Sequence, residues 1–186
     1  MSKVIVISGP SGVGKTTIYK KLLNELSDKI DFSISATTRE PRKNEVNGVD
    51  YYFVSREEFE NLIKNNEFVE WAIVYDHYYG TLKKEIERIT KSGKNCLLDV
   101  DVQGGVNVKR NLPDSYLIFI KPPSKEALKE RLIGRNLDDE KEIEKRLDVA
   151  EKEMKYAGFY DVVIENDDLE SCYKRVKSEV LRVIES

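Results

Sequence analysis

The chain has 186 residues, of which 40% are hydrophobic and 35% are charged, and its formal net charge is −3 at pH 7. These values are typical of one soluble globular domain, and they argue against a disordered chain and against a general nucleic-acid binder. No apolar run approaches the roughly 20 residues of a membrane-spanning helix, and we expect no signal peptide before the strand-like run at Lys3. The two cysteines, Cys96 and Cys172, have no metal-ligand spacing, so we expect a reducing, cytoplasmic location.

Buried strands and amphipathic helices alternate along most of the chain. Apolar runs typical of buried strands cover residues 3–8, 95–101, 116–120 and 161–164. Helices are predicted at residues 15–26 and at the C-terminus, where Val176, Val180 and Ile184 lie on one face. Strands that are apolar on both faces and separated by helices predict an α/β fold, with a parallel sheet covered by helices. We assign this core to residues 1–31, 83–123 and 156–186.

A β-rich segment interrupts this alternation between residues 32 and 82. Strands are predicted there at residues 32–37, 49–54 and 68–75. A short helix separates the last two, because Ser55 and Glu58 form a capping box and Phe59, Leu62 and Ile63 share one face of the turns that follow. We expect this insert to form a mixed, β-rich unit of its own.

Charged helical sequence fills residues 124–155. Ile143, Leu147, Ala150 and Met154 give this segment one narrow apolar stripe. A solvated helical hairpin explains most of its charges, and a thin apolar face also suits a mobile flap over a site. The pattern leaves both interpretations open.

The strongest motif lies between the first strand and the first helix. Gly9-Pro-Ser-Gly-Val-Gly-Lys-Thr16 matches the pattern G-x-x-x-x-G-K-S/T, whose glycines let successive main-chain N–H groups surround phosphates. In this motif Lys15 reaches the outer phosphates, the hydroxyl of Thr16 is a ligand for Mg²⁺, and the helix adds its positive amino-terminal end. An ordinary glycine turn is the alternative, but the strand–loop–helix context favours a phosphate-binding loop, or P-loop.

Two carboxylates end the buried strand at residues 95–101. Asp99 and Asp101 lie at its carboxyl end, which in a parallel sheet is beside the P-loop, where Mg²⁺ must bind. Solvated aspartates at the end of a strand are the alternative for so short a motif. The P-loop favours a role near the metal.

The β-rich insert carries groups suited to a second phosphate. Arg39 and Arg42 lie three residues apart around Pro41, and arginine is suited to bidentate contacts with phosphate. Tyr51 and Tyr79 offer phenolic hydrogen-bond donors. Taken alone, the segment is equally compatible with a surface loop that carries two arginines and with two tyrosines of the core.

Glu70 and Thr81 are candidates for reading a purine base. A carboxylate accepts hydrogen bonds from both N1–H and N2–H₂ of guanine, and a hydroxyl donates to O6. Adenine has no N1–H and would leave a buried carboxylate unpaired, at a large cost in binding free energy. For Glu70 taken alone, a surface charge at the edge of a strand is the commoner explanation.

With these motifs in order, the sequence resembles the guanylate kinases nearly from end to end. The similarity runs from Ile5 to Asp168, and its most specific matches are Ser35–Arg42, Glu45–Gly48, Asn66–Trp71, Tyr78–Gly80 and Leu98–Gly104. The resemblance implies a P-loop kinase that transfers a phosphoryl group reversibly from ATP to GMP, and to dGMP, with Mg²⁺. It also implies one domain, residues 1–186, with a parallel five-stranded core, a GMP-binding insert (residues 32–82) and a helical lid (residues 124–155).

The resemblance further implies a role for each candidate residue. ATP would lie on Gly9, Pro10, Ser11, Gly12, Val13, Gly14, Lys15, Thr16 and Thr17, with Asn166 near the adenine. Guanine would be read by Ser35, Glu70, Thr81 and Asp101, and the GMP phosphate held by Arg39, Arg42, Tyr51 and Tyr79. The transferring phosphate would be contacted by Lys15 and Arg39 and approached by the lid arginines Arg131, Arg135 and Arg146, and the catalytic Asp99 would lie near it and the hydrated Mg²⁺. Thr81 stands where serine is common in the family and keeps the hydroxyl.

Such a reaction needs no general base, because the GMP phosphate is already an anionic nucleophile. His77 is therefore interpreted as a loop residue, and Trp71 as packing beneath the nucleotide. Two other functions stay open: a kinase of another small molecule such as AMP, dTMP or a sugar, and a non-catalytic interaction module like the guanylate-kinase-like domains of scaffold proteins. Intact Lys15 and Thr16 disfavour the module. No obligate protein partner, nucleic acid or membrane is expected.

Overall fold

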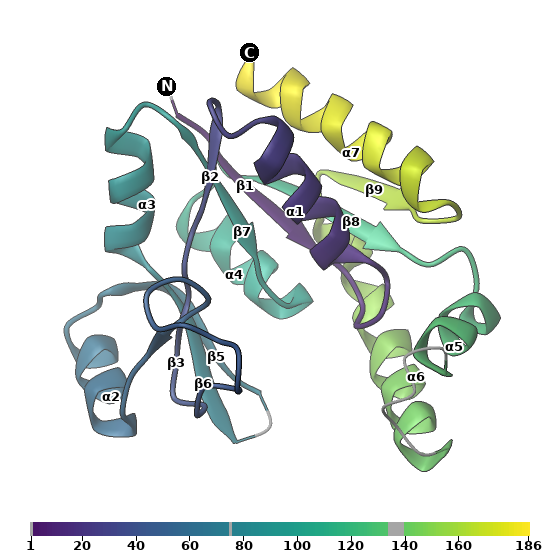
Figure 1. Cartoon of the computed structure of the whole chain (residues 1–186), viewed down its shortest axis with the longest axis horizontal. Helices are drawn as coiled ribbons and strands as arrows, with labels where there is room; N and C mark the ends of the chain where they lie inside the picture. The colour runs from purple at the N-terminus through teal and green to yellow at the C-terminus, as the bar shows by residue number, and fades with distance from the viewer. Residues whose placement is uncertain (1, 75, 134–139) are drawn as a thin grey trace.

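The computed structural model of the chain describes residues 2–74, 76–133 and 140–186. A large parallel sheet between helices, a smaller mixed sheet and a helical hairpin make up the fold (Figure 1). In chain order the elements are β1 (Val4–Ser8), α1 (Lys15–Glu25), β2 (Ile30–Phe32), β3 (Ala36–Thr37), β4 (Tyr52–Phe53), α2 (Arg56–Lys64), β5 (Phe68–Val74), β6 (His77–Leu82), α3 (Lys83–Lys91), β7 (Asn95–Asp99), α4 (Val102–Asn111), β8 (Tyr116–Lys121), α5 (Lys125–Ile133), α6 (Glu140–Met154), the 3₁₀ turn η1 (Lys155–Phe159), β9 (Val162–Glu165) and α7 (Leu169–Ile184).

In the described part of the chain, the large sheet has five parallel strands in the order β2-β7-β1-β8-β9. This confirms the predicted parallel core. β1 is the central strand, so the loop that follows Ser8 leaves the sheet between β7 and β8. Because the strands run in one direction, the carboxyl ends of β1 and β7 meet at the same edge of the sheet.

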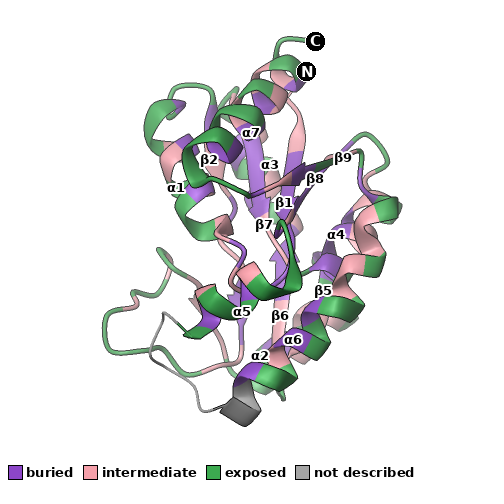
Figure 2. Ribbon diagram, turned by 90° about the vertical axis from the view of Figure 1, so that its right-hand side faces the viewer, coloured by how far each residue is buried: buried purple, intermediate pink, exposed green. Residues whose placement is uncertain are grey.

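Alternation along β1 sorts the core into two layers. Ile5 and Ile7 belong to an apolar cluster with α1 and α7, in which Leu22 and Val176 are fully buried. Val6, between them, belongs to the opposite cluster with α3 and α4. Successive side chains of a strand point to opposite faces, so a strand that is apolar on both faces must lie inside the protein. Figure 2 shows the buried residues concentrated in these central strands.

The smaller sheet has the order β4-β3-β6-β5, with β5 antiparallel to β6 and β3 parallel to β4. The predicted capping box starts α2: Oγ of Ser55 accepts from the N–H of Glu58, and the Glu58 carboxylate accepts from the N–H of Ser55. Phe59 of α2 is fully buried, and its ring stacks on that of Phe68 with 4.4 Å between the centroids. The mixed, β-rich character of the insert is therefore confirmed.

The single strand predicted at residues 32–37 is wrong. Phe32 ends β2 in the large sheet, whereas residues 36–37 form β3 in the smaller one. Between the two strands, the N–H of Ile34 donates to Oε2 of Glu85 at 3.1 Å instead of to a neighbouring strand. The chain leaves one sheet and enters the other at this point.

Two other interpretations are wrong. His77, expected in a loop, is the first residue of β6 and pairs with Val74 across the hairpin. Trp71, expected beneath the nucleotide, is 41% exposed, and its ring centroid lies 5.7 Å from that of Tyr78. Trp71 follows Glu70 in β5, and neighbouring residues of a strand face opposite sides, so the indole lies on the side of the sheet away from Glu70.

The helical hairpin of α5 and α6 is held by a small apolar cluster. Leu128 and Leu132 of α5 pack with Ile143, Leu147 and Ala150 of α6, which confirms most of the predicted apolar stripe. In Figure 1 the hairpin and the smaller sheet both lie below the large sheet, on opposite sides of the view. None of the helices in the described ranges is both long and apolar enough to cross a bilayer.

Candidate active site

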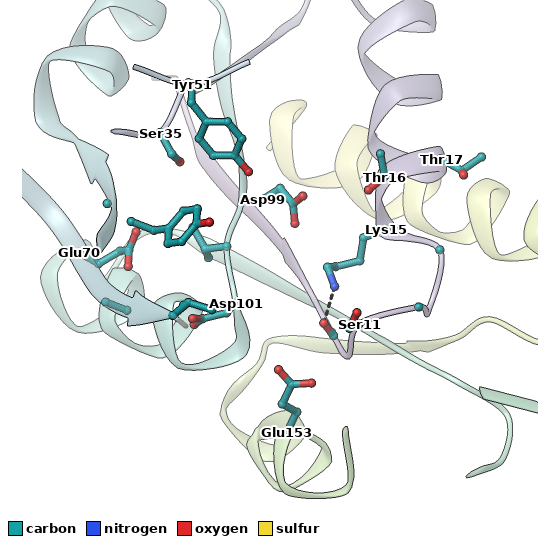
Figure 3. Close-up of a pocket in the computed structure, with 18 residues that line it drawn as sticks. Ser11, Lys15, Thr16, Thr17, Ser35, Tyr51, Glu70, Asp99, Asp101 and Glu153 are labelled. Atoms are coloured by element: carbon teal, nitrogen blue, oxygen red, sulfur yellow. Dashed lines mark hydrogen bonds between the residues drawn. The ribbon is translucent and has the colours of Figure 1, made fainter. Parts of the chain in front are cut away.

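A cavity of about 400 Å³ lies at the carboxyl edge of the large sheet (Figure 3). Its walls come from the P-loop with the start of α1, from the loop after β7, from the smaller sheet and from α6. The lining residues are Gly9, Ser11, Gly12, Gly14, Lys15, Thr16, Thr17, Ser35, Tyr51, Glu70, Ala72, Val74, Tyr79, Gly80, Asp99, Val100, Asp101 and Glu153. Most of the predicted ATP- and GMP-binding residues therefore meet in one cavity.

Glycines shape the P-loop. A Cβ atom on Gly9 would lie 2.1 Å from the carbonyl oxygen of Ile120, so only glycine fits between the strands here. Gly14, the N-cap of α1, has a φ of 102°, a left-handed conformation that other residues rarely adopt. Nζ of Lys15 donates to the carbonyl oxygens of Gly9 and Pro10, at 2.5 and 3.1 Å. The ammonium group is thereby held beside the positive amino-terminal end of α1.

The two aspartates at the end of β7 lie in different environments. Asp99 lines the cavity; burial raises the pKa of its carboxyl to about 6, and the charge of Lys15 opposes this rise. Asp101 is the N-cap of α4, where its Oδ1 accepts a hydrogen bond from the N–H of Gly104 at 2.6 Å. Both carboxyls reach the cavity, as predicted, and Asp101 is fixed in place by the helix that it caps.

Glu70 lies in the wall formed by the smaller sheet and is only 8% exposed. Its Oε1 accepts a hydrogen bond from Oγ1 of Thr81 at 2.7 Å. Burial raises the pKa of Glu70 to about 7; the bond from Thr81 opposes this rise, and the nearby charge of Asp101 adds to it. The alternative of a surface charge at a strand edge is therefore wrong. A buried carboxyl beside a hydroxyl and a second carboxylate keeps capacity to accept hydrogen bonds from a ligand.

Arg39 lies beside two tyrosines of the cavity wall. The ring centroids of Tyr51 and Tyr79 are 6.0 Å apart, and Nε of Arg39 donates to the Tyr79 hydroxyl at 3.3 Å. The Arg39 guanidinium also lies 5.5 Å from the centre of the Tyr51 ring and forms an ion pair with Glu45 at 2.9 Å. Neither Arg39 nor Arg42 lines the cavity, and Arg42 is exposed.

Arg131 and Arg146, predicted in the lid, do not line the cavity. Nη2 of Arg131 donates to the carbonyl oxygen of Asn166 at 2.7 Å, and Nδ2 of Asn166 donates to the carbonyl oxygen of Val13, also at 2.7 Å. Asn166 therefore joins α5 to the P-loop. Arg146 is half-buried on α6, and Arg135 lies outside the described residues.

The structure adds Glu153, which the sequence analysis did not single out. Glu153, in the last turn of α6, lines the cavity, and Figure 3 shows its carboxylate pointing toward Ser11 and Lys15. Burial raises its pKa, and the charge of Lys15 opposes this rise. Arg146 lies seven residues earlier, so two helical turns place both residues on one face of α6. That spacing is a usable signal, but it is hidden among the many charges of this segment.

The central position of β1, the P-loop that follows it and the carboxyls that end β7 define the class of P-loop nucleotide-binding proteins. Comparison with known proteins then identifies the family. The family model for guanylate kinase matches residues 1–182. The chain therefore belongs to the guanylate kinase family.

Individual relatives agree with this assignment. A guanylate kinase of Bacillus cereus is 45% identical over 178 residues, which cover 96% of this chain and 87% of the relative. A guanylate kinase of Porphyromonas gingivalis is 48% identical over 186 residues, which cover 99% of both chains. The crystal structure of guanylate kinase from Anaplasma phagocytophilum matches with a TM-score of 0.76 at 37% identity, over 97% of this chain and 85% of that chain.

Proposed function

We propose that this chain carries out the guanylate kinase reaction, phosphoryl transfer from ATP to GMP, within the single cavity described above. Membership of the family makes the chain an ATP:GMP phosphotransferase, and neither a kinase of another small molecule nor a non-catalytic module is favoured. One observation supports the assignment of the site: Glu70 and Lys15 line the same cavity. A carboxyl suited to guanine and a loop suited to phosphates are thereby brought together.

Guanine is read by the smaller sheet together with Asp101. The carboxylate of Glu70 accepts from N1–H and N2–H₂ of the base. Thr81 is expected from the sequence to donate to O6, but its one O–H donates to Oε1 of Glu70 at 2.7 Å, and Thr81 does not line the cavity. Thr81 therefore orients the carboxylate, and the hydroxyl of Ser35, in the same wall, donates to the base. Adenine lacks the N1–H and would leave Glu70 buried without a donor from the ligand.

The phosphate of GMP is held by Arg39, Arg42, Tyr51 and Tyr79. Arg39 is paired with Glu45 at 2.9 Å, and a dianionic phosphate is a stronger bidentate partner for a guanidinium than one carboxylate. The bond from Nε to the Tyr79 hydroxyl already orients this guanidinium. GMP therefore replaces Glu45 with little rearrangement of the arginine.

ATP lies on residues 9–17, with the adenine near Asn166. The residues at its phosphates fit Mg²⁺, because the Thr16 hydroxyl and the Asp99 carboxyl both line the cavity and Mg²⁺ prefers oxygen ligands. Within the described ranges, no three His, Cys, Asp or Glu side chains are grouped so that they could hold a metal ion. Thr16 would bind the ion directly and Asp99 through its waters; when bound, Mg²⁺ neutralises charge on the phosphates.

The transfer is direct. An oxygen of the GMP phosphate forms a bond to the γ-phosphorus of ATP while the bond from that phosphorus to ADP breaks, and no proton has to be removed. Lys15 and the arginines Arg39, Arg131, Arg135 and Arg146 offset the negative charge of the transferring group. Water must be excluded, so we assign residues 32–82 as a GMP-binding domain and residues 124–155 as a lid that close over the substrates. We place this reaction in purine nucleotide metabolism in the cytoplasm.

Binding of purine monophosphates tests this assignment of the cavity. Isothermal titration should rank GMP above IMP, which lacks the 2-amino group, and IMP above AMP, which also lacks the N1–H. Losing one hydrogen bond to the Glu70 carboxylate costs about 1.5–3 kcal/mol, so IMP should bind roughly 10- to 150-fold more weakly than GMP. Equal affinity for GMP and AMP would contradict the proposed reading of the base.

A further inference from the structure

A carboxylate of α6 faces the P-loop. Glu153 reaches the cavity from the last turn of α6, and in Figure 3 its carboxylate lies below Ser11 and Lys15. Burial raises the pKa of this carboxyl, and the charge of Lys15 and the nearby main-chain N–H of Ser11 oppose the rise. Its Oε2 is buried and has no hydrogen-bond partner among the residues that the structure describes. An anionic group therefore lies where main-chain donors and a lysine gather for phosphate.

The position of these contacts in the loop indicates which phosphate is affected. Ser11 is the third residue of the motif, and α1 begins at Lys15 after its N-cap Gly14. Binding at the amino-terminal end of this helix would place the inner phosphates over residues 14–16. Lys15 serves the outer phosphates. The carboxylate is thus nearest to the end of the loop that faces the terminal phosphate of a nucleoside triphosphate.

We propose that the Glu153 carboxylate is an internal competitor of the terminal phosphate of ATP, occupying the outer end of the P-loop until the triphosphate displaces it. This inference rests on the proposed function, in which ATP binds to the P-loop. Two anions cannot share Ser11 and Lys15 without strong repulsion in a partly buried site. The last turn of α6 must therefore move away when ATP binds. The position of this helix then depends on whether the bound nucleotide has a third phosphate. ADP, which lacks that phosphate, displaces Glu153 less.

Nucleotide titrations of Glu153→Gln test the competition. In the presence of Mg²⁺ and without GMP, the variant should bind ATP about tenfold more tightly than wild type, because one negative charge is removed near the triphosphate. The increase in affinity for ADP should stay below about threefold. Glu144 is an exposed glutamate on the same helix, so Glu144→Gln is the matched control. It should change the dissociation constant of neither ATP nor ADP. An ATP affinity that is unchanged or weaker in Glu153→Gln, or equal gains for ATP and ADP, would overturn the inference.

A probe without a nucleoside separates this inference from the proposed function. Inorganic tripolyphosphate should also bind more tightly to Glu153→Gln than to wild type. The corresponding increase in affinity for pyrophosphate should be smaller. A wild type that binds no ATP would contradict the proposed donor, while the tripolyphosphate comparison would still decide whether Glu153 competes. Thermal unfolding of both variants shows whether they are folded, and Glu144→Gln shows the effect of the same substitution elsewhere on α6.

Discussion

Oγ1 of Thr81 donates a hydrogen bond to Oε1 of Glu70 at 2.7 Å, between partner residues of the antiparallel strands β5 and β6. This bond holds a buried carboxyl toward the cavity, and burial raises the pKa of that carboxyl to about 7. A group kept partly protonated by burial becomes a strong acceptor once guanine supplies two N–H donors. The pair therefore links the packing of the smaller sheet to the choice of base.

Glu70→Gln should weaken GMP binding much more than ATP binding. The amide keeps the size of the side chain but replaces a charged acceptor with a neutral one, at a cost of about 2–3 kcal/mol, or roughly 30- to 150-fold in the GMP KM. Steady-state kinetics with each substrate varied in turn measure this, and exposed Glu67→Gln is the control. An unchanged GMP KM would remove Glu70 from the site.

The same substitution should stabilise the folded protein above pH 7. Below about pH 4.5, Glu70 is protonated in both states; as pH rises to about 7, the unfolded chain loses the proton while the buried carboxyl keeps it. Wild type thus loses up to about 3 kcal/mol of stability across this window, and Glu70→Gln does not. Urea unfolding should find the variant more stable than wild type at pH 8, and the difference in their free energies of unfolding should shrink toward pH 5. A difference in the free energy of unfolding that is independent of pH would show that the carboxyl does not titrate in this window.

Arg39→Ala and Arg42→Ala should each raise the GMP KM roughly tenfold or more, because each removes a charged contact to the phosphate. Arg39→Ala should also lower kcat, since a misplaced acceptor reacts slowly. Arg110→Ala, an exposed arginine at the end of α4, is the matched control and should leave both constants unchanged. If all three variants behaved alike, the phosphate clamp would be wrong.

Local patterns were enough to predict the parts of the molecule that depend on neighbouring residues. The apolar run at residues 4–8 is buried on both faces, the Ser55 capping box starts α2, and Gly9–Gly14 forms the loop between β1 and α1. In each case strand alternation, helix capping or a glycine conformation is set within a few residues of sequence. The burial of Glu70 was expected only from its proposed role as a reader of guanine.

Long-range contacts explain what the sequence did not reveal. The break between β2 and β3 depends on Glu85, whose carboxylate accepts a hydrogen bond from the N–H of Ile34, 51 residues earlier in the chain. Trp71 is apolar, yet its face of β5 is exposed because the other face forms the cavity wall. Glu153 belongs to a charged helix, and only its position in the cavity wall distinguishes it from its solvated neighbours. The break at Ile34 and the exposure of Trp71 have no signal within a short window of sequence, and the spacing that marks Glu153 is hidden among the other charges of α6.

GMP-dependent release of ADP is the most direct test of the proposed reaction. A coupled assay with ATP and Mg²⁺ should show rapid turnover of wild type with GMP and little with AMP, CMP, UMP or dTMP. Lys15→Ala should remain folded by circular dichroism but lose roughly a thousandfold or more in kcat, because the charge that stabilises the transferring phosphate is gone. A wild type that releases no ADP with any of these monophosphates, or a Lys15→Ala variant as active as wild type, would contradict phosphoryl transfer at this P-loop.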